Sequence, residues 1–273
     1  MTRVRLTLKR APALRVDLRG VTPATLAGLA PPQIEQVTVT HGAQTLALAE
    51  LFTVRCDEAP DDVAELLLEG DLSRVDRIGW QLAGGRIVVA GPVGDYAGAC
   101  MTAGEMRVQG RAGLLAACEM AGGALTIEGD VGDHAASSLP GSMDGMRGGT
   151  LIVRGNAGDR FADRMRRGSA LVFGDVGDFL ASRLVAGTLA IGGRCGAHVG
   201  YGMRRGSVVF AGDVPRIAPT FVPALAEAPV AWQLLARDLA RHGGPFAGLP
   251  ERRIVRHLGD LSADGRGELI VAA

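Results

Sequence analysis

The sequence predicts an all-β protein, a right-handed parallel β-helix of about 19-residue coils with small mixed α/β end segments. Three observations favour this fold: a unit that recurs along residues 85–212, strand-like alternation inside it, and glycines at fixed offsets. Each step is 19 residues except the 26-residue step from Gly123 to Gly149. The units begin at Gly85, Gly104, Gly123, Gly149, Gly168, Gly187 and Gly206.

Each unit opens with an expected strand. Apolar residues stand two and four positions after the first glycine, a period-two alternation that indicates a strand with one buried face. A helical repeat is disfavoured, because each interior glycine would cost roughly 1 kcal/mol. The pairs are Ile87/Val89, Met106/Val108, Leu125/Ile127, Leu151/Val153, Ala170/Val172, Leu189/Ile191 and Val208/Phe210.

Glycines six and nine positions after the first are expected to form corners, where positive φ or close backbone approach is needed. Nineteen residues at about 3.3 Å each give a perimeter of roughly 60 Å, enough for three short faces. Stacked coils would lie about 4.8 Å apart, so one offset becomes a ladder. Long side chains three residues before each unit would fill the interior: Leu82, Met101, Met120, Met146, Met165, Leu184 and Met203.

The first part of the chain, residues 1–63, is predicted to be a strand-rich N-terminal cap. Thr22 before Pro23 signals the start of a short helix. A hairpin turn is expected at residues 41–43. The expected strands are residues 4–8, 14–18, 34–40, 44–48 and 51–54. A cap would cover the strand edge that an open solenoid exposes.

The solenoid is expected to span residues 64–214 in about eight coils, of which the first is irregular. The pattern breaks at Pro215, so residues 215–273 are predicted to be a helix-containing C-terminal cap. Its helix should begin at Pro229 and stop at Gly243, with an apolar face. That face carries Trp232, Leu235 and Leu239, and strands are expected at residues 254–258 and 268–271.

Composition excludes several classes of function. The 29 basic and 29 acidic residues cancel, and only 4% of residues are aromatic, which argues against a nucleic-acid partner. No apolar run approaches the ~18 residues of a membrane span. The charged N-terminus has no signal-peptide core, so a cytoplasmic location is expected.

Neither a catalytic nor a metal site is expected in this chain. Cys56, Cys100, Cys118 and Cys195 lack metal or redox spacing, and the histidines are scattered. Aspartates after corner glycines, such as Asp130 and Asp175, suit turn stabilisation better than calcium binding, whose repeats run in nine residues.

An arginine ladder is the candidate binding feature. Arg147, Arg166 and Arg204 stand two residues before a unit, and Arg167 and Arg205 stand one residue before. Stacking would place Arg166 and Arg204 about 10 Å apart. Such a ladder could bind a linear polyanion or an acidic partner, since guanidinium pairs well with carboxylates. The alternative is a solvated basic edge balanced by nearby aspartates.

The units resemble the β-helical C subunit of formylmethanofuran dehydrogenase, most clearly in residues 85–104, GRIVVAGPVGDYAGACMTAG. The repeat is also similar to the C-terminal domain of the glutamate synthase large subunit. The resemblance covers residues 64–214, and the two end segments favour the C-subunit family. An arginine-rich chain whose only lysine is Lys9 favours the bacterial version, the C subunit of the formyltransferase/hydrolase complex.

This resemblance implies a non-catalytic scaffold in a cytoplasmic complex of tetrahydromethanopterin-linked one-carbon metabolism. Such a complex transfers a formyl group to a methanofuran-type carrier with a polyglutamate tail and hydrolyses it to formate. Catalysis would lie on amidohydrolase-like and formyltransferase-like partner subunits, and no cofactor would be bound by this chain alone. The alternatives are a subunit of a molybdenum or tungsten formylmethanofuran dehydrogenase, or a glutamate-synthase-like domain.

Two parts of the chain are expected to make contacts in such a complex. The insertion at residues 134–144 interrupts a regular surface and is the expected partner-contact loop. The arginine ladder is the expected groove edge for the polyglutamate tail.

Overall fold

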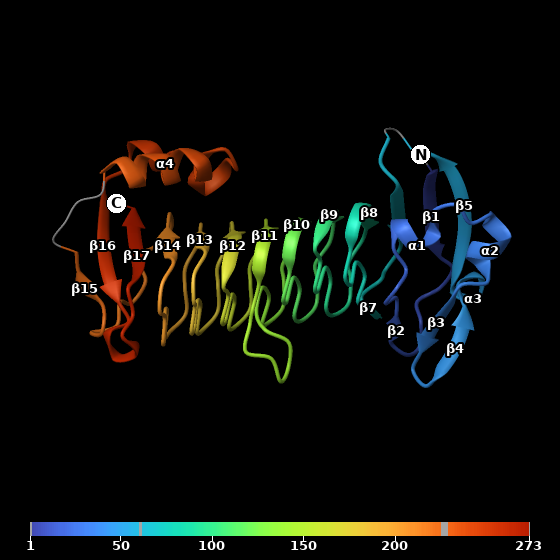
Figure 1. The fold of residues 1–273 in the computed structure, drawn as a ribbon, viewed down its shortest axis with the longest axis horizontal. Helices are drawn as coiled ribbons and strands as arrows, with labels where there is room; N and C mark the ends of the chain where they lie inside the picture. Colours follow the sequence, from blue (N-terminus) through green and yellow to red (C-terminus); the bar gives the residue numbers. More distant parts are fainter. Residues whose placement is uncertain (1, 60–61, 225–228, 273) are drawn as a thin grey trace.

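A computed structural model describes residues 2–59, 62–224 and 229–272, and within them the chain is mainly β, arranged as a row of stacked coils (Figure 1). Expectations for residues 1, 60–61, 225–228 and 273 lie outside this description. The strands that open the coils are β6(Glu65–Glu69), β8(Ala83–Ala90), β9(Ala103–Val108), β10(Ala121–Ile127), β11(Arg147–Val153), β12(Arg167–Val172), β13(Thr188–Ile191) and β14(Ser207–Phe210).

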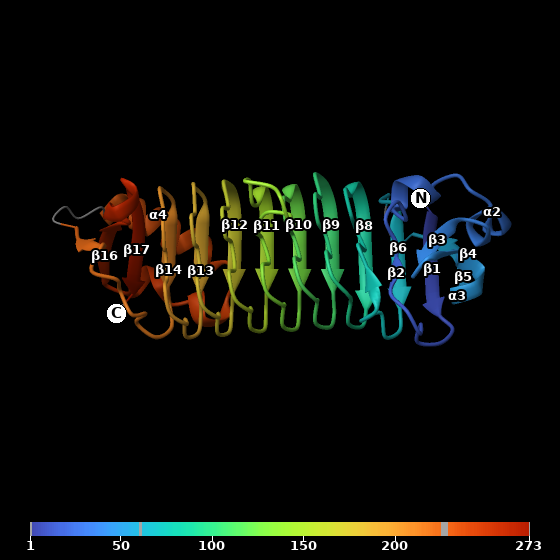
Figure 2. The same ribbon diagram turned by 90° about the horizontal axis from the view of Figure 1, so that it is seen from below.

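These strands lie side by side in one mainly parallel sheet, as Figure 2 shows from a second direction. Equivalent offsets face one another, for instance Leu125 opposite Leu151 and Ala170 opposite Leu189. A second column of parallel bridges runs through Val176 and its equivalents in neighbouring coils. The predicted register is therefore confirmed for the apolar positions of the strands, whereas the pairing shifts at the start of β8, β10 and β11.

Close contact with the preceding coil explains the glycine that opens each unit, because a Cβ there would lie 2.6–3.2 Å from a carbonyl oxygen of that coil, and in four units a buried methionine adds to the contact. Met120 is fully buried, and its methyl carbon would lie 2.7 Å from a Cβ added at Gly149. Gly149 also has φ +81°, which favours glycine. Corner glycines have another reason: a Cβ at Gly174 would lie 2.3 Å from Asn156 Oδ1 in the preceding coil. Close approach, rather than positive φ, selects glycine there.

Aspartates at the corners, which were expected to stabilise turns, also accept hydrogen bonds from the next coil. The Oδ1 atom of Asp133 accepts a hydrogen bond from the backbone N–H of Asp159 at 2.8 Å, and Asp159 accepts one from Asp178 at 2.8 Å. In the next column Asn156 accepts from the N–H of Asp175 at 2.8 Å. Each side chain supplies a hydrogen bond that ties one coil to the next.

The N-terminal segment continues the same sheet. Strand β1(Thr2–Leu8) pairs parallel with β6 and antiparallel with β5(Phe52–Glu58), which ends the sheet. Thr22 caps α1(Pro23–Leu26), as predicted, and Gly42 lies in the predicted hairpin turn. The remaining elements are β2(Val16–Asp17), α2(Pro31–Glu35), β3(Thr38–His41), β4(Gln44–Ala47), α3(Leu48–Leu51) and β7(Val75–Asp76).

The strand predicted for residues 34–40 is wrong in its first half. Pro31 and Pro32 set φ for a helical turn, so α2 takes Ile34 and Glu35, and β3 begins only at Thr38.

The C-terminal segment also adds to the sheet. Strand β17(Gly267–Ala272) pairs parallel with β14, and β16(Ile254–Gly259) joins it antiparallel. Helix α4(Pro229–Ala240) buries Trp232 and Leu239 against the outer face of the last coils, where Leu171 and Val209 are buried. The other elements are β15(Val222–Pro223), η1(Gly244–Phe246), η2(Leu249–Glu251) and η3(Leu261–Ala263). No helix in the described ranges is long and apolar enough to cross a membrane.

Candidate functional site

The five arginines of the predicted ladder line one groove of about 550 Å³. Arg147 and Arg167 are the first residues of β11 and β12, and Arg166, Arg204 and Arg205 lie just before β12 or β14, so the parallel pairing of these strands gathers them. The coil between β12 and β14 has Val185 and Ala186 at the equivalent positions, and these two residues complete the lining. The groove is thus an arginine-lined channel with an apolar middle.

The register at one end differs from the prediction. Equal offsets predict Arg147 beside Arg166, but the Cα partner of Arg147 is Arg167. The pairing shifts between Arg147 and Thr150, where Gly149 has a left-handed backbone that interrupts the strand. The shift leaves both arginines in the groove.

Two of the arginines are paired with carboxylates. Arg147 Nη2 lies 3.4 Å from Glu119 Oε2, and Arg166 Nε lies 3.1 Å from Asp144 Oδ1. Both arginine side chains are about half exposed, at 46% and 48%. Arg167, by contrast, is exposed and has no hydrogen bond or ion pair from its side chain to any residue in 2–59, 62–224 and 229–272.

Arg204 and Arg205 likewise have no side-chain partner in the described part of the chain, and both are exposed. They also line an adjacent hollow of about 500 Å³ with Ala263, Asp264 and Arg266. Arg266 is held there because its backbone N–H donates to Arg204 O at 2.7 Å. The row of arginines therefore extends to Arg266 in the C-terminal segment. Asp264 is the acidic residue in the lining of this hollow.

Arg266 also belongs to the groove region, although the repeat pattern did not predict it. Strand β17 pairs in register with β14, with Glu268 opposite Ser207, so Arg266 occupies the position equivalent to Arg205. A signal was present in the sequence: Gly267, Leu269 and Val271 repeat the glycine and apolar spacing that opens a coil.

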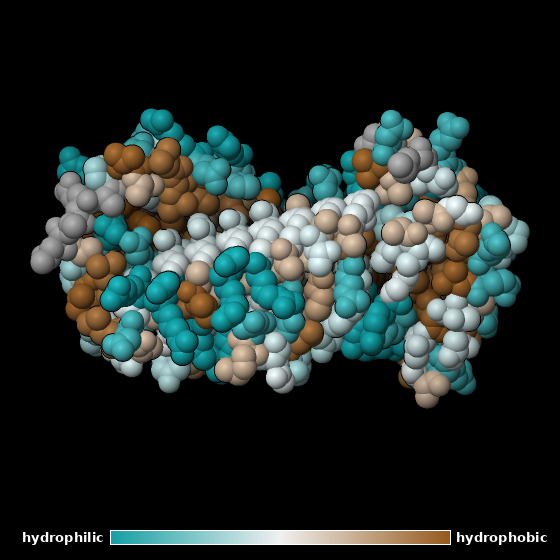
Figure 3. All heavy atoms as spheres, viewed as in Figure 1, coloured by the Kyte–Doolittle hydropathy of each residue, from teal (hydrophilic) through white to brown (hydrophobic). Residues whose placement is uncertain are grey.

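The surface agrees with this arrangement. Figure 3 shows hydrophilic side chains gathered across the lower part of the coils between β11 and β14, on the face seen in Figure 1. The unpaired guanidinium groups make this part of the surface locally positive, although the formal charges of the whole chain cancel.

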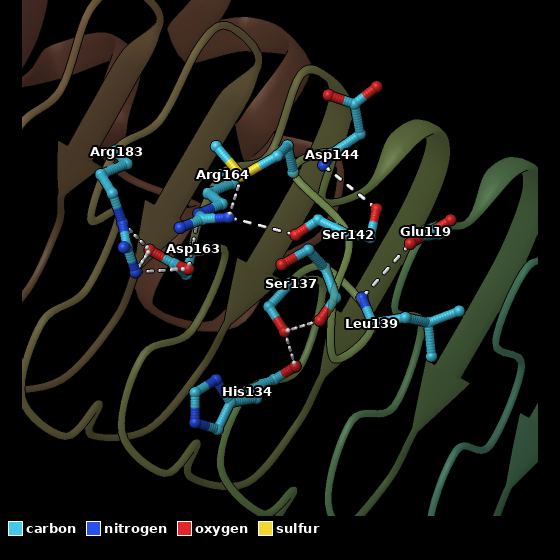
Figure 4. A network of polar contacts seen from close by, with 11 residues as sticks. Glu119, His134, Ser137, Leu139, Ser142, Asp144, Asp163, Arg164 and Arg183 are labelled. Atoms are coloured by element: carbon cyan, nitrogen blue, oxygen red, sulfur yellow. Dashed lines mark hydrogen bonds and ion pairs between the residues drawn. The ribbon is translucent and has the colours of Figure 1, made fainter.

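The insertion at residues 134–144 forms a loop between β10 and β11, and polar contacts hold it against the coils (Figure 4). Arg164 Nη1 donates to Ser142 O at 3.1 Å, and Leu139 N donates to Glu119 Oε1 at 3.3 Å. Next to them Met143 is 71% exposed. The loop thus has a fixed base and an apolar side chain at its surface.

Burial disfavours the reactive form of the cysteines. It raises the pKa of Cys195 to about 12, and it also raises the pKa of Cys56, Cys100 and Cys118. A raised pKa disfavours the thiolate, the nucleophilic form. Among the residues that the structure describes, no three His, Cys, Asp or Glu side chains come together as metal ligands.

Comparison with known proteins links the whole chain to one solved structure. The crystal structure of the formyltransferase/hydrolase complex (FhcABCD) from Methylorubrum extorquens with methylofuran contains a chain 39% identical to this one. The match has a TM-score of 0.90 and covers 98% of this chain and 99% of that chain. No family model matches the sequence.

Two curated relatives match over shorter stretches. The C subunit of the formyltransferase/hydrolase complex Fhc of the same organism is 40% identical over 81 residues, 30% of this chain and 29% of that protein. The C subunit of tungsten-containing formylmethanofuran dehydrogenase 2 of Methanothermobacter wolfeii is 33% identical over 101 residues, 36% of this chain and 37% of that protein. These matches therefore span about a third of the curated relatives.

Proposed function

Because the chain belongs to the C-subunit family of formyltransferase/hydrolase and formylmethanofuran dehydrogenase complexes, we propose that it is a scaffold subunit of a cytoplasmic formyltransferase/hydrolase complex. The observation that carries this proposal is the match to a chain of the FhcABCD complex over 98% of this chain. The complex would pass a formyl group to a methanofuran-type carrier and release formate, with tetrahydromethanopterin as the preceding carrier.

The fold suits a scaffold. We infer that the coils form a right-handed parallel β-helix, on the basis of the parallel sheet, the second column of bridges and the inter-coil hydrogen bonds. The division into caps at residues 1–63 and 215–273 and a solenoid at 64–214 belongs to the same proposal. A solenoid of this length presents rigid, extended faces on which other subunits can dock.

Catalysis is assigned to partner subunits of the amidohydrolase and formyltransferase types. The loop at residues 134–144 is the proposed partner contact, because it has a fixed base and the exposed side chain of Met143. A tungsten or molybdenum dehydrogenase complex is the second candidate, supported by the match to the Methanothermobacter protein. The co-purifying subunits would distinguish the two.

The arginine groove is the proposed contact for the polyglutamate tail of the carrier. Arg147, Arg166, Arg167, Arg204 and Arg205 share one groove, and three of them carry unpaired charge among the described residues. A carboxylate on each glutamate would match guanidinium groups repeated from coil to coil. The chain itself would bind no cofactor outside the complex.

The scaffold proposal is tested by purifying a tagged version of the chain from its native cell and identifying the co-eluting proteins by mass spectrometry. We expect an amidohydrolase-like and a formyltransferase-like protein. A molybdenum or tungsten protein instead would favour the second candidate, and elution of the chain alone would contradict both.

A further inference from the structure

Two of the five groove arginines are paired with carboxylates and three are not. At the end near β11, Glu119 and Asp144 already hold Arg147 and Arg166, but Arg167 beside them has no partner in the described chain. At the other end, Arg204 and Arg205 also have no carboxylate partner among the described residues. An incoming anion is therefore drawn first to these three arginines, where no internal contact has to be broken.

The apolar middle separates two charged positions. Val185 and Ala186 occupy the coil between Arg167 and Arg205, so these arginines lie two coils apart. Two coil steps correspond to about 10 Å. A single carboxylate cannot reach both positions, whereas a flexible chain with several carboxylates can.

Both internal carboxylates also anchor the loop. Asp144 is the last residue of the insertion, and both of its oxygens lie near Arg166, at 3.1 Å from Nε and 3.4 Å from Nη1. Glu119 uses one oxygen for Arg147 and the other for the N–H of Leu139 in the loop. The same two carboxylates therefore hold the loop in place and neutralise two arginines of the groove.

We propose that the groove binds a flexible oligocarboxylate at both charged positions, and that Asp144 is its built-in competitor. This deepens the proposed function and rests on the groove being an anion site. The ligand attaches at Arg204, Arg205 and Arg266, crosses the apolar middle to the unpaired Arg167, and places a further carboxylate on the neighbouring Arg166. Asp144 is displaced, and the loop loses one of its anchors.

The exchange at Arg166 is nearly balanced in energy, because one exposed carboxylate replaces another and such pairs are individually weak. Attachment at the free arginines shifts this exchange toward the ligand carboxylate. Once the first carboxylates are bound, the next is held at high effective concentration beside Arg166. Binding should therefore depend on ligand length, and ligand binding should loosen the loop of residues 138–144.

The test uses the full chain, with hexaglutamate and free glutamate as probes in calorimetric titrations at low salt. Hexaglutamate is expected to bind at least tenfold tighter than glutamate. Asp144→Asn should tighten hexaglutamate binding about threefold to tenfold, because it removes the competitor. Arg204→Gln with Arg205→Gln should weaken it more than tenfold, whereas Arg241→Gln, remote from the groove, should leave it unchanged.

Loop release is measured by hydrogen–deuterium exchange. Hexaglutamate should speed exchange of the Asp144 and Gly145 amides, which the loop protects through bonds to Ser142 and Arg164. In the Asp144→Asn variant, exchange should already be fast without ligand. Tight binding with unchanged loop exchange, or an Asp144→Asn variant of unchanged affinity, would overturn the competitor role.

The experiments distinguish an error in the groove inference from an error in the scaffold proposal. If hexaglutamate does not bind although the tagged chain co-elutes with its partner subunits, the inference on the groove is wrong and the scaffold proposal stands. If hexaglutamate binds as expected but the chain elutes alone, the scaffold proposal is wrong and the anion site stands.

Discussion

Replacing Gly148 with alanine tests whether close backbone contact between coils holds the stack together. Gly148 lies opposite Ala121 in the neighbouring strand, and a Cβ added to it would be 2.3 Å from Ala121 O. Ordinary contact begins at 3.4 Å, so the two coils must separate by about 1 Å. The backbone at Gly148 has no positive φ, which makes the collision the main cost.

The expected loss of stability follows from this separation. Overpacking costs about 1–3 kcal/mol. The N–H groups of Arg147 and Gly148 both donate to Met120 O, and weakening these bonds costs about 1 kcal/mol more. Alanine also lowers the conformational entropy of the unfolded chain, which offsets about 0.4–1 kcal/mol of this loss. We expect Gly148→Ala to lower the free energy of unfolding by about 1–3.5 kcal/mol.

The measurement is a urea titration of the full chain followed by far-ultraviolet circular dichroism. Gly248→Ala is the matched control, because φ there is −89° and no atom lies within 4 Å of the added Cβ. Its stability should rise by about 0.4–1 kcal/mol, because only the entropy of the unfolded chain changes there. Equal midpoints for the two variants would refute the argument that coil spacing selects glycine.

Three further variants test other contacts. Asp159→Ala should lower stability by about 1 kcal/mol in urea, because the N–H of Asp178 loses its acceptor, whereas Asp159→Asn keeps an acceptor oxygen and should lose less. Asp175 has a lowered pKa because the backbone N–H and then the guanidinium of Arg194 donate to its carboxylate. Its stabilisation is complete above the ordinary carboxyl pKa of about 4 and is lost as pH falls through the lower folded value. Asp175→Asn should remove that part of the acid dependence in urea titrations between pH 7 and pH 2; an unchanged profile would contradict it. Trp232→Ala should cost about 3–5 kcal/mol in thermal and urea unfolding, because its ring is buried between α4 and the outer face of the sheet. A loss below about 1 kcal/mol would show that α4 is not firmly packed.

The repeated part of the chain is readable from the sequence because each coil position makes the same contact. Gly149 and its equivalents must leave room for a carbonyl oxygen of the preceding coil, and Leu151 and its equivalents must face the interior, so this spacing recurs in every unit. The arginines could be placed in one groove for the same reason, since equal offsets in stacked coils lie side by side.

The sequence pattern did not predict features that depend on a single contact between distant parts of the chain. The pairing of β17 with β14 brings Arg266 to the groove from the far end of the chain. Leu171 points outward from its strand and is apolar because α4 covers it, which a period-two pattern alone does not predict. The helical turn at Ile34 was missed because a local proline effect overrides the strand-like alternation after it.

The measurement that most directly tests the central claim compares the complex with and without this chain. The partner subunits would be purified with and without it, their assembly followed by native mass spectrometry, and formate release from formyl carrier measured for each preparation and for the chain alone. The scaffold account predicts that the chain alone releases no formate and that its omission disrupts assembly. Formate release by the isolated chain, or full assembly and activity of the partners without it, would contradict the account.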